Sequence, residues 1–271
     1  MPRSPALSTR PLLYDDPAVQ FLAEEAGAHG VYVQNALAEG EGEGFVVLQR
    51  GTARGLCWFG SRGNLVVIAP EDIHGGLLAD RVQSSGHPWR IAMGPTEVID
   101  ALADRCGREP LVHRDQVYYA GSAATAARDL VRSDVRTAER GDRDRLLQAT
   151  MLLNESDLHI DPARVDRRWL RDSIDERLAN GTTRVLGPVG SIDCKLDFGS
   201  DGPGGLVIEG VFTFPPARGR HLAASLVASC LAAAPHARVC LHVGMHNVPA
   251  RAAYERAGMS VVDRCRLLLL P

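Results

Sequence analysis

A basic turn between an apolar strand and an alanine-rich helix constrains the fold of this 271-residue chain more than any other feature. Residues 206–214 read LVIEGVFTF, which is typical of a buried strand. The turn RGRH at residues 218–221 leads into the helix, and a second apolar strand is predicted at 239–243. A short helix then ends at Gly258. This alternation of strands and helices predicts a mixed α/β sheet.

The basic turn is a candidate anion-binding site. Backbone N–H groups at the start of a helix point outward without a partner, and the helix dipole adds a partial positive charge there. We therefore expect the turn to bind the phosphates of a nucleotide-like cofactor. Two better-known phosphate loops do not fit. Residues 218–225 lack the GxxxxGK(S/T) pattern of a P-loop, and Gly219 alone does not supply the three glycines of a dinucleotide-binding turn.

The same stretch resembles the central motif of the GNAT acyltransferase superfamily, in which a strand is followed by Arg/Gln-x-x-Gly-x-Gly/Ala at a helix start. The six positions are here Arg218, Gly219, Arg220, His221, Leu222 and Ala223. The strand at 239–243 and the pattern N-x-x-A-x-x-x-Y-x-x-x-G at residues 247–258 resemble the C-terminal motif of the same superfamily. The resemblance implies an N-acyltransferase that uses acetyl-CoA or another acyl-CoA as co-substrate, without a metal.

His221 departs from the family pattern, which usually has glycine at this position. Glycine lets a backbone approach a ligand closely. A histidine could narrow the diphosphate site, or add a cationic contact when it is protonated. It could also mark a domain in which cofactor binding has decayed.

The resemblance also assigns cofactor contacts. The backbone groups expected to meet the pantetheine arm are those of Val211, Phe212 and Thr213, and residues 218–223 are expected to meet the diphosphate. Asn247 and Arg251 lie one helical turn apart and are expected to face the pantetheine or phosphate side together. A solvated surface charge is the alternative interpretation of Arg251.

Two residues are candidates for proton transfer. Tyr254 stands where many members of the superfamily have a tyrosine that protonates the leaving thiolate; the alternative is a half-buried aromatic residue under the last helix. Glu209, the only carboxylate of the strand at 206–214, is a candidate general base acting through water, or a structural partner of an arginine. In this superfamily two parallel strands splay apart; here they would be residues 208–214 and 239–243. Gly210 would form the bulge that starts the separation, or would merely relieve crowding within the strand.

A similar order of elements precedes this domain and predicts a second, degenerate half. Residues 1–10 are expected to be a loose lead-in, followed by a helix from Pro17. The apolar run 31–37 precedes a glycine-rich loop. The further elements expected in this half are strands at 45–49, 55–60, 64–69, 89–93 and 117–120 and helices at 72–85 and 94–106. The N-terminal domain is thus residues 1–121, and a small, polar linker follows at 122–130.

The C-terminal domain spans residues 131–271 and is predicted to begin with a strand at 131–138. The predicted fold class is α/β with a mixed sheet, in two GNAT-like halves, of which the C-terminal one has the splayed central sheet. The N-terminal half lacks a basic glycine turn before an alanine-rich helix, so we expect it not to bind the acyl donor. It either shapes the acceptor pocket or is a structural partner. Tandem arrangements with one working half are familiar in the superfamily, including enzymes that resemble mycothiol synthase. The chain looks most similar to bacterial members with an additional N-terminal domain.

Composition excludes several other classes. A net charge of −3 argues against a nucleic-acid-binding surface, and no run of eighteen apolar residues predicts a membrane span. The N-terminal sequence lacks the apolar core of a signal peptide. Six cysteines without Cys-x-x-Cys pairs favour reduced thiols in the cytoplasm. His242 and His246 lack an identifiable third ligand, so no metal site is predicted.

The function expected from these features is direct transfer of an acyl group from acetyl-CoA to the amine of a small molecule. Neither a nucleophile elbow nor a Ser/His/Asp order favours a covalent acyl-enzyme. Two alternatives stay open: a non-catalytic acyl-CoA-binding sensor or assembly module, and a protein-lysine acetyltransferase, which would need a wide, acidic acceptor groove. A homodimer is a possible oligomeric state under each of these three functions.

Overall fold

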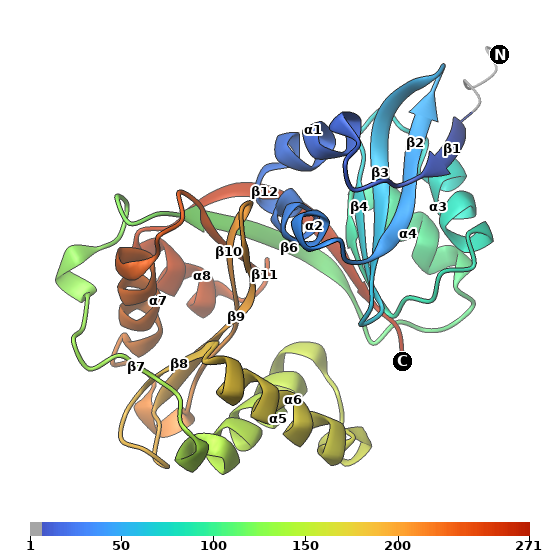
Figure 1. Cartoon of the computed structure of the whole chain (residues 1–271). Helices are drawn as coiled ribbons and strands as arrows, with labels where there is room; N and C mark the ends of the chain where they lie inside the picture. The colour runs from blue at the N-terminus through green and yellow to red at the C-terminus, as the bar shows by residue number, and fades with distance from the viewer. Residues whose placement is uncertain (1–6) are drawn as a thin grey trace. The chain divides into compact units, whose positions relative to one another are not determined.

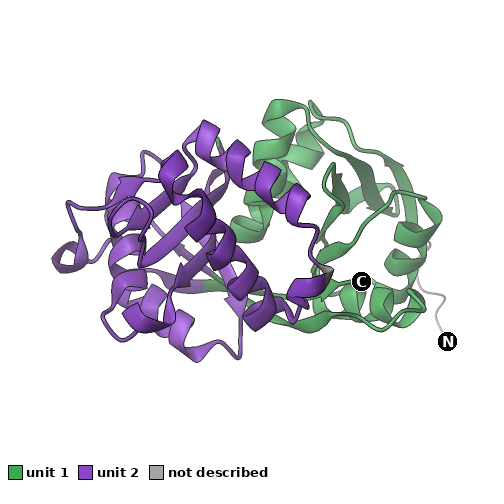
Figure 2. Ribbon diagram, turned by 90° about the horizontal axis from the view of Figure 1, so that it is seen from below, with its two compact units in different colours: residues 1–118, 202–204, 262–271 green, residues 119–201, 205–261 purple. Residues whose placement is uncertain are grey.

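The same order of helices and strands occurs twice along the chain. The computed structural model describes residues 7–271 and divides into two compact units (Figures 1 and 2). Unit 1 comprises Met1–Tyr118, Gly202–Gly204 and Val262–Pro271, and unit 2 comprises Tyr119–Asp201 and Gly205–Val261. Both parallel and antiparallel strand pairs occur in each unit, so the predicted mixed α/β class is confirmed.

The first series of elements has the order β-α-α-β-β-β-α-β-α-β. Its members are β1 (Leu7–Pro11), α1 (Pro17–Glu25), α2 (Gly27–Glu39), β2 (Glu43–Gln49), β3 (Thr52–Gly60), β4 (Asn64–Ile68), α3 (Gly75–Ser84), β5 (Ile91–Gly94), α4 (Thr96–Arg105) and β6 (Val112–Gly121). Strand β1 corrects the expected loose lead-in, because residues 7–11 pair antiparallel with β2. Residues 1–6 of that expectation lie outside the described residues.

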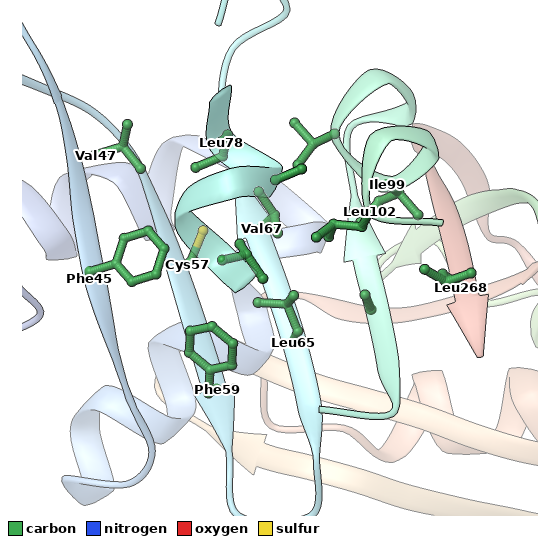
Figure 3. Packing of buried hydrophobic residues seen from close by; sticks show 14 of the residues in the cluster. Phe45, Val47, Cys57, Phe59, Leu65, Val67, Leu78, Ile99, Leu102 and Leu268 are labelled. Atoms are coloured by element: carbon green, nitrogen blue, oxygen red, sulfur yellow. The ribbon is translucent and has the colours of Figure 1, made fainter. Parts of the chain in front are cut away.

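Strands β2–β4 of unit 1 bury both of their faces. Phe45, Cys57, Phe59, Leu65 and Val67 project to one side, where Leu78 of α3 and Ile99 and Leu102 of α4 cover them (Figure 3). The alternate residues, among them Val46, Leu56, Trp58 and Val66, pack against Val19 and Ala23 of α1 and Val33 and Ala36 of α2. Successive residues of a strand point to opposite faces of the sheet, so both faces carry apolar side chains. Helices cover each face, and unit 1 therefore has three layers.

His29 of α2 is a buried polar residue in this unit. Its Nε2 lies 2.9 Å from the carbonyl oxygen of Val67, and its Nδ1 lies 2.9 Å from the hydroxyl of Tyr118. A carbonyl can only accept, so Nε2 carries the proton and Nδ1 accepts from Tyr118, which corresponds to the neutral imidazole. Burial lowers the pKa of His29 below its ordinary value.

We expect the stability of the protein to fall as the pH drops below about 6.5, the ordinary pKa of histidine. Unfolded His29 binds a proton there, whereas the folded imidazole stays neutral, so unfolding is favoured by up to about 1.4 kcal/mol per pH unit. Thermal unfolding of the wild type and of His29→Gln between pH 5 and pH 7.5 measures this. The glutamine variant should lose less stability over this range. Parallel curves for the two proteins would contradict the assignment.

The second series repeats the order of the first. Its members are β7 (Arg136–Thr137), α5 (Arg143–Leu158), α6 (Arg167–Asn180), β8 (Thr183–Leu186), β9 (Cys194–Gly202), β10 (Gly205–Thr213), α7 (Leu222–Ala233), β11 (Val239–Gly244), α8 (Val248–Ala257) and β12 (Ser260–Leu269). From residue 262 onward β12 belongs to unit 1, where it pairs antiparallel with β5.

The strand predicted at 131–138 is wrong for most of its length. A short 3-10 helix, Arg128–Leu130, precedes this segment, and only the two residues of β7 pair with β8. Val131 is exposed, and Arg132 and Asp134 pair with each other instead of alternating between a buried and a solvated face. A segment whose residues do not alternate between apolar and polar cannot cover a hydrophobic core as a strand. This explains why β7 is only two residues long.

The strand predicted at residues 206–214 is β10, which lies inside the sheet of unit 2. Its strands lie in the order β6-β11-β10-β9-β8-β7, with β6 contributing its last residues. Helices α5 and α6 pack on this sheet through Leu146, Ala149, Leu170 and Ile174, which contact a cluster that includes Val185, Phe212 and Phe214. Helix α7 is apolar around its whole circumference and is almost entirely buried.

No helix within residues 7–271 combines the length and the apolar character that crossing a membrane requires.

Candidate active site

The parallel strands β10 and β11 separate after two residue pairs. Leu206 pairs with Val239 and Val207 with Cys240, and the ladder between the two strands ends there. Strand β10 nevertheless continues to Thr213 and β11 to Gly244. The facing edges of residues 208–213 and 241–244 are therefore not joined by ladder hydrogen bonds. This is the opened seam that the sequence predicted.

Gly210 lies at the start of the separated part of β10 in a left-handed conformation, with φ +55°. A Cβ atom at this position would lie 2.8 Å from Asp197 Oδ2 and 2.8 Å from Lys195 Nζ, both on β9. These two buried side chains form an ion pair of 2.5 Å, and Arg177 and Thr183 also donate to Asp197. Burial opposes ionisation of Asp197, but Lys195 and Arg177 hold its pKa below the ordinary value. Only glycine leaves room for this cluster beside the backbone of β10.

A cavity of about 730 Å³ continues from the separated strands. Most residues with a predicted role line it: Val211, Phe212, Thr213, Arg218, Gly219, His221, Leu222, Ala223, Asn247 and Tyr254. All of these residues belong to unit 2. Its size falls in the range of small-molecule and cofactor sites.

Helix α7 begins at the wall of this cavity. His221 is its N-cap, and no side chain caps the first turn. The first intrahelical bond of this turn runs from Ser225 N to His221 O, at 3.0 Å, and Leu222, Ala223 and Ala224 line the cavity. Amides of the first turn have no intrahelical acceptor, so they are available to an anion in the cavity.

His221 adopts the left-handed backbone conformation, with φ +57°. This region strongly favours glycine, which explains why the family motif usually has glycine at this position. The histidine therefore takes the backbone conformation that the motif requires, at a cost in strain, and its side chain remains exposed.

Two arginines and two histidines are among the residues that line the cavity. Arg218 donates from Nε to the carbonyl oxygen of Thr213 at 3.1 Å, which directs its guanidinium back along β10. Arg218, His221, His246 and Arg256 all line the cavity. An anionic ligand would therefore meet two guanidinium groups and free backbone amides together.

Tyr254 projects from α8 into the same cavity and is 94% buried. Its ring lies edge-on to that of Tyr119, with centroids 5.8 Å apart. Burial, and to a smaller degree the charge of Asp157, raises the pKa of Tyr254 well above its ordinary value. The hydroxyl therefore keeps its proton at neutral pH and can act as a proton donor.

Three of the predicted site residues do not line the cavity. Arg251 donates to the hydroxyl of Tyr119 and to the carbonyl oxygen of Met245, each at 3.2 Å. Asn247 and Arg251 were expected to face the cofactor together, but only Asn247 lines the cavity. Asn247 is the N-cap of α8, and its side chain accepts from Ala250 N at 3.2 Å.

The other two residues face elsewhere as well. Arg220 is exposed and pairs with Asp193 at 3.3 Å. The carboxyl group of Glu209 lies against β9: a Cβ atom on Gly199 would stand 2.1 Å from its carboxyl carbon. Glu209 is therefore placed away from the cavity that the neighbouring residues of β10 line.

Several lining residues were missed in the sequence. Helix α5 contributes Leu153, Ser156 and Asp157, about fifty residues before the motif, and α8 contributes Arg256. The residues from α5 belong to no motif, and their direction depends on how α5 packs against β10. No metal-holding group of three or more His, Cys, Asp or Glu residues is found within the described part of the chain.

Comparison with known protein families finds a match, which contains all the residues that line the cavity. Residues 144–259 match the family model described as "Acetyltransferase (GNAT) family". This match covers the whole of the cavity wall and excludes most of unit 1. No curated protein matches the chain.

Solved structures share the fold over almost the whole chain. A GCN5-related N-acetyltransferase from Sphaerobacter thermophilus is 19% identical, with a TM-score of 0.57, and the alignment covers 97% of this chain and 94% of that one. An acetyltransferase of the GNAT family from Colwellia psychrerythraea is 11% identical (TM-score 0.51; 97% and 100% covered). A Drosophila protein is 12% identical (TM-score 0.63; 97% and 98% covered). At these identities the likeness concerns the fold.

Proposed function

We propose that the protein transfers the acetyl group of acetyl-CoA to the amine of a small molecule in the cavity of unit 2, on the premise that residues 144–259, which match the GNAT acetyltransferase family, form an acetyltransferase domain. The observation that carries the proposal is the opened seam between β10 and β11, which continues directly into a cavity lined by cations and by the start of α7. The extended thioester arm of acetyl-CoA would lie in the opened seam. Its diphosphate would bind the cationic side chains and the free amides at the start of α7.

The residues support a direct transfer. The backbone of Val211, Phe212 and Thr213 has no ladder partner on β11, so its N–H groups can bind the pantetheine arm and polarise the thioester carbonyl. The amine nitrogen attacks the carbonyl carbon, the carbon–sulfur bond breaks, and the CoA thiolate leaves. Tyr254, which is protonated at neutral pH, supplies the proton that converts the thiolate to a thiol.

A small acceptor fits this cavity better than a protein lysine does. Protein-lysine substrates would favour a wide, acidic groove. The described cavity has a volume of about 730 Å³, much of which CoA would occupy, and its lining includes a single carboxylate among the described residues.

We propose that unit 1 does not bind an acyl donor. The strands that correspond to the seam are β4 and β5, and they pair in parallel at three of the four residues of β5. The start of α3 lies at a cavity of about 260 Å³ whose lining includes Glu71, Asp72 and Glu97. Glu97 also accepts from Gly75 N at 3.3 Å. Carboxylates at this position would repel a diphosphate.

Calorimetry with acetyl-CoA tests the proposal. The wild type should bind, and Arg218→Ala should weaken binding about tenfold, because a charge-assisted contact with phosphate is lost. Arg220→Ala is a matched control two residues away: its guanidinium pairs with Asp193 and does not line the cavity, so its affinity should stay within about twofold of the wild type. A wild type that binds neither acetyl-CoA nor CoA would overturn the proposed function.

A further inference from the structure

Asp157 is the single carboxylate among the described residues that line the cavity of unit 2. It lies in the last turn of α5, which ends at Leu158, and it is half-buried. The other charged or ionisable lining residues, apart from Tyr254, are Arg218, Arg256, His221 and His246. Beside the two guanidinium groups, Asp157 is thus the one negative side chain in the described lining to which a positively charged or proton-donating part of a ligand can bind.

The position of Asp157 within the cavity is set by its neighbours. Its charge acts on Tyr254, whose hydroxyl is the proposed proton donor to the thiolate. Leu153 and Ser156, from the same helix, line the cavity with Val211–Thr213 of β10. Asp157 therefore lines the cavity close enough to Tyr254 for its charge to act on the hydroxyl, and in the proposed function Tyr254 marks the position of the thioester sulfur.

We propose that Asp157 binds the reacting nitrogen of the acceptor, an inference that rests on the proposed function. The nitrogen of a primary amine becomes positively charged as it attacks the thioester carbonyl. A carboxylate beside it stabilises that charge more in the transition state than in the bound substrate, which is the condition for catalysis.

The proton balance is closed by these two side chains. As the carbon–nitrogen bond forms and the carbon–sulfur bond breaks, the nitrogen loses one proton to Asp157 and the thiolate gains one from Tyr254. The proton on Asp157 then returns through water to the Tyr254 phenolate. The products are the amide and CoA thiol, and both side chains regain their starting forms.

The charge of Asp157 also restricts the substrate class. An acceptor with a carboxylate next to the reacting amine, such as an α-amino acid, would bring two negative charges together. The acceptor that this site favours is a primary amine without an acidic group beside the nitrogen. Glu209, the base candidate of the sequence analysis, cannot substitute because its carboxyl group lies against Gly199.

Two thioethers of CoA test the inference without knowledge of the acceptor. S-(2-aminoethyl)-CoA carries an ammonium group near the sulfur, and S-propyl-CoA is its neutral counterpart of the same length. Calorimetry should show that the wild type prefers the aminoethyl thioether by about tenfold, or about 1.4 kcal/mol. Asp157→Asn should lose this preference and should still bind S-propyl-CoA as the wild type does.

Glu155→Gln supplies the matched control, because Glu155 is an exposed carboxylate on the same helix and does not line the cavity. It should keep the full preference. If the wild type binds S-propyl-CoA but has no preference, or if Asp157→Asn keeps the preference, the inference about Asp157 is wrong while the proposed function stands. If the wild type binds no CoA derivative, the proposed function fails, and the inference fails with it.

Discussion

Replacing Tyr254 with phenylalanine should lower kcat for acetyl transfer by about 100-fold, while the affinity for acetyl-CoA changes by less than about twofold. The ring is buried in the wall of the cavity, so phenylalanine fills the same space and removes only the hydroxyl. Without a proton donor the thiolate must leave as an anion from a partly buried site, which raises the barrier. The affinity is preserved because the phosphate contacts lie elsewhere in the cavity.

The measurement follows release of the CoA thiol with the primary amine that the wild type acetylates fastest, or with water as the acceptor if no amine reacts. Tyr119→Phe is the matched control. Tyr119 lies against Tyr254, but its hydroxyl bonds Glu255 at 2.7 Å and does not line the cavity. It should keep kcat within about threefold of the wild type. Equal losses in the two variants would show that the hydroxyl of Tyr254 has no specific role. Binding of acetyl-CoA without turnover in the wild type would favour the non-catalytic module.

Replacing Gly210 with alanine should cost about 2–5 kcal/mol in the free energy of unfolding and should weaken acetyl-CoA binding. Two costs add. Alanine is strained by about 1–2 kcal/mol at a φ of +55°. In addition, its Cβ atom would lie 2.8 Å from each member of the buried Lys195–Asp197 pair, and overpacking of this kind costs about 1–3 kcal/mol. Movement of the backbone at Gly210 would also displace Val211 and Phe212, which line the cavity.

Gly181→Ala separates the two costs. Gly181 ends α6 with a φ of +63°, and the nearest atom to an added Cβ is Thr137 Cγ2 at 3.6 Å, an ordinary contact. This control should lose only about 1–2 kcal/mol and should bind acetyl-CoA as the wild type does. Urea unfolding of the two variants and calorimetry provide the comparison. If Gly210→Ala were as stable as Gly181→Ala, the buried Lys195–Asp197 pair would have moved aside without a loss of stability, and the predicted overpacking would be wrong.

The buried pair also explains why a lysine occurs in a chain that otherwise uses arginine. Lys195 is the only lysine, and its side chain is 2% exposed. Its compact ammonium group fits between Asp197 and the bare Cα of Gly210, whereas a planar guanidinium would be larger. The left-handed backbone of β10 at Gly210 therefore packs against a cluster of side chains from β9, α6 and β8.

Elements with a clear local signal were predicted well. The strand, the basic turn and the helix that became β10 and α7 were identified because burial periodicity and the turn residues are properties of neighbouring positions. Helix α2 received no assignment because it is buried on several sides, including His29, Val31, Val33 and Asn35, and so lacks a polar face that would reveal its period.

The sequence by itself determined the family resemblance, the strand along which the seam opens and the turn before α7 that lines the cavity, because all of these are carried by residues close together along the chain. Only the tertiary structure decided which side chains enter the cavity. Arg256 lines it and Arg251 does not, because α8 begins at its cap, Asn247, and its packing against Tyr119 fixes its rotation. Asp157 reaches the cavity from a helix with no motif. Side-chain direction depends on what packs against an element from distant parts of the chain, and local sequence does not encode it.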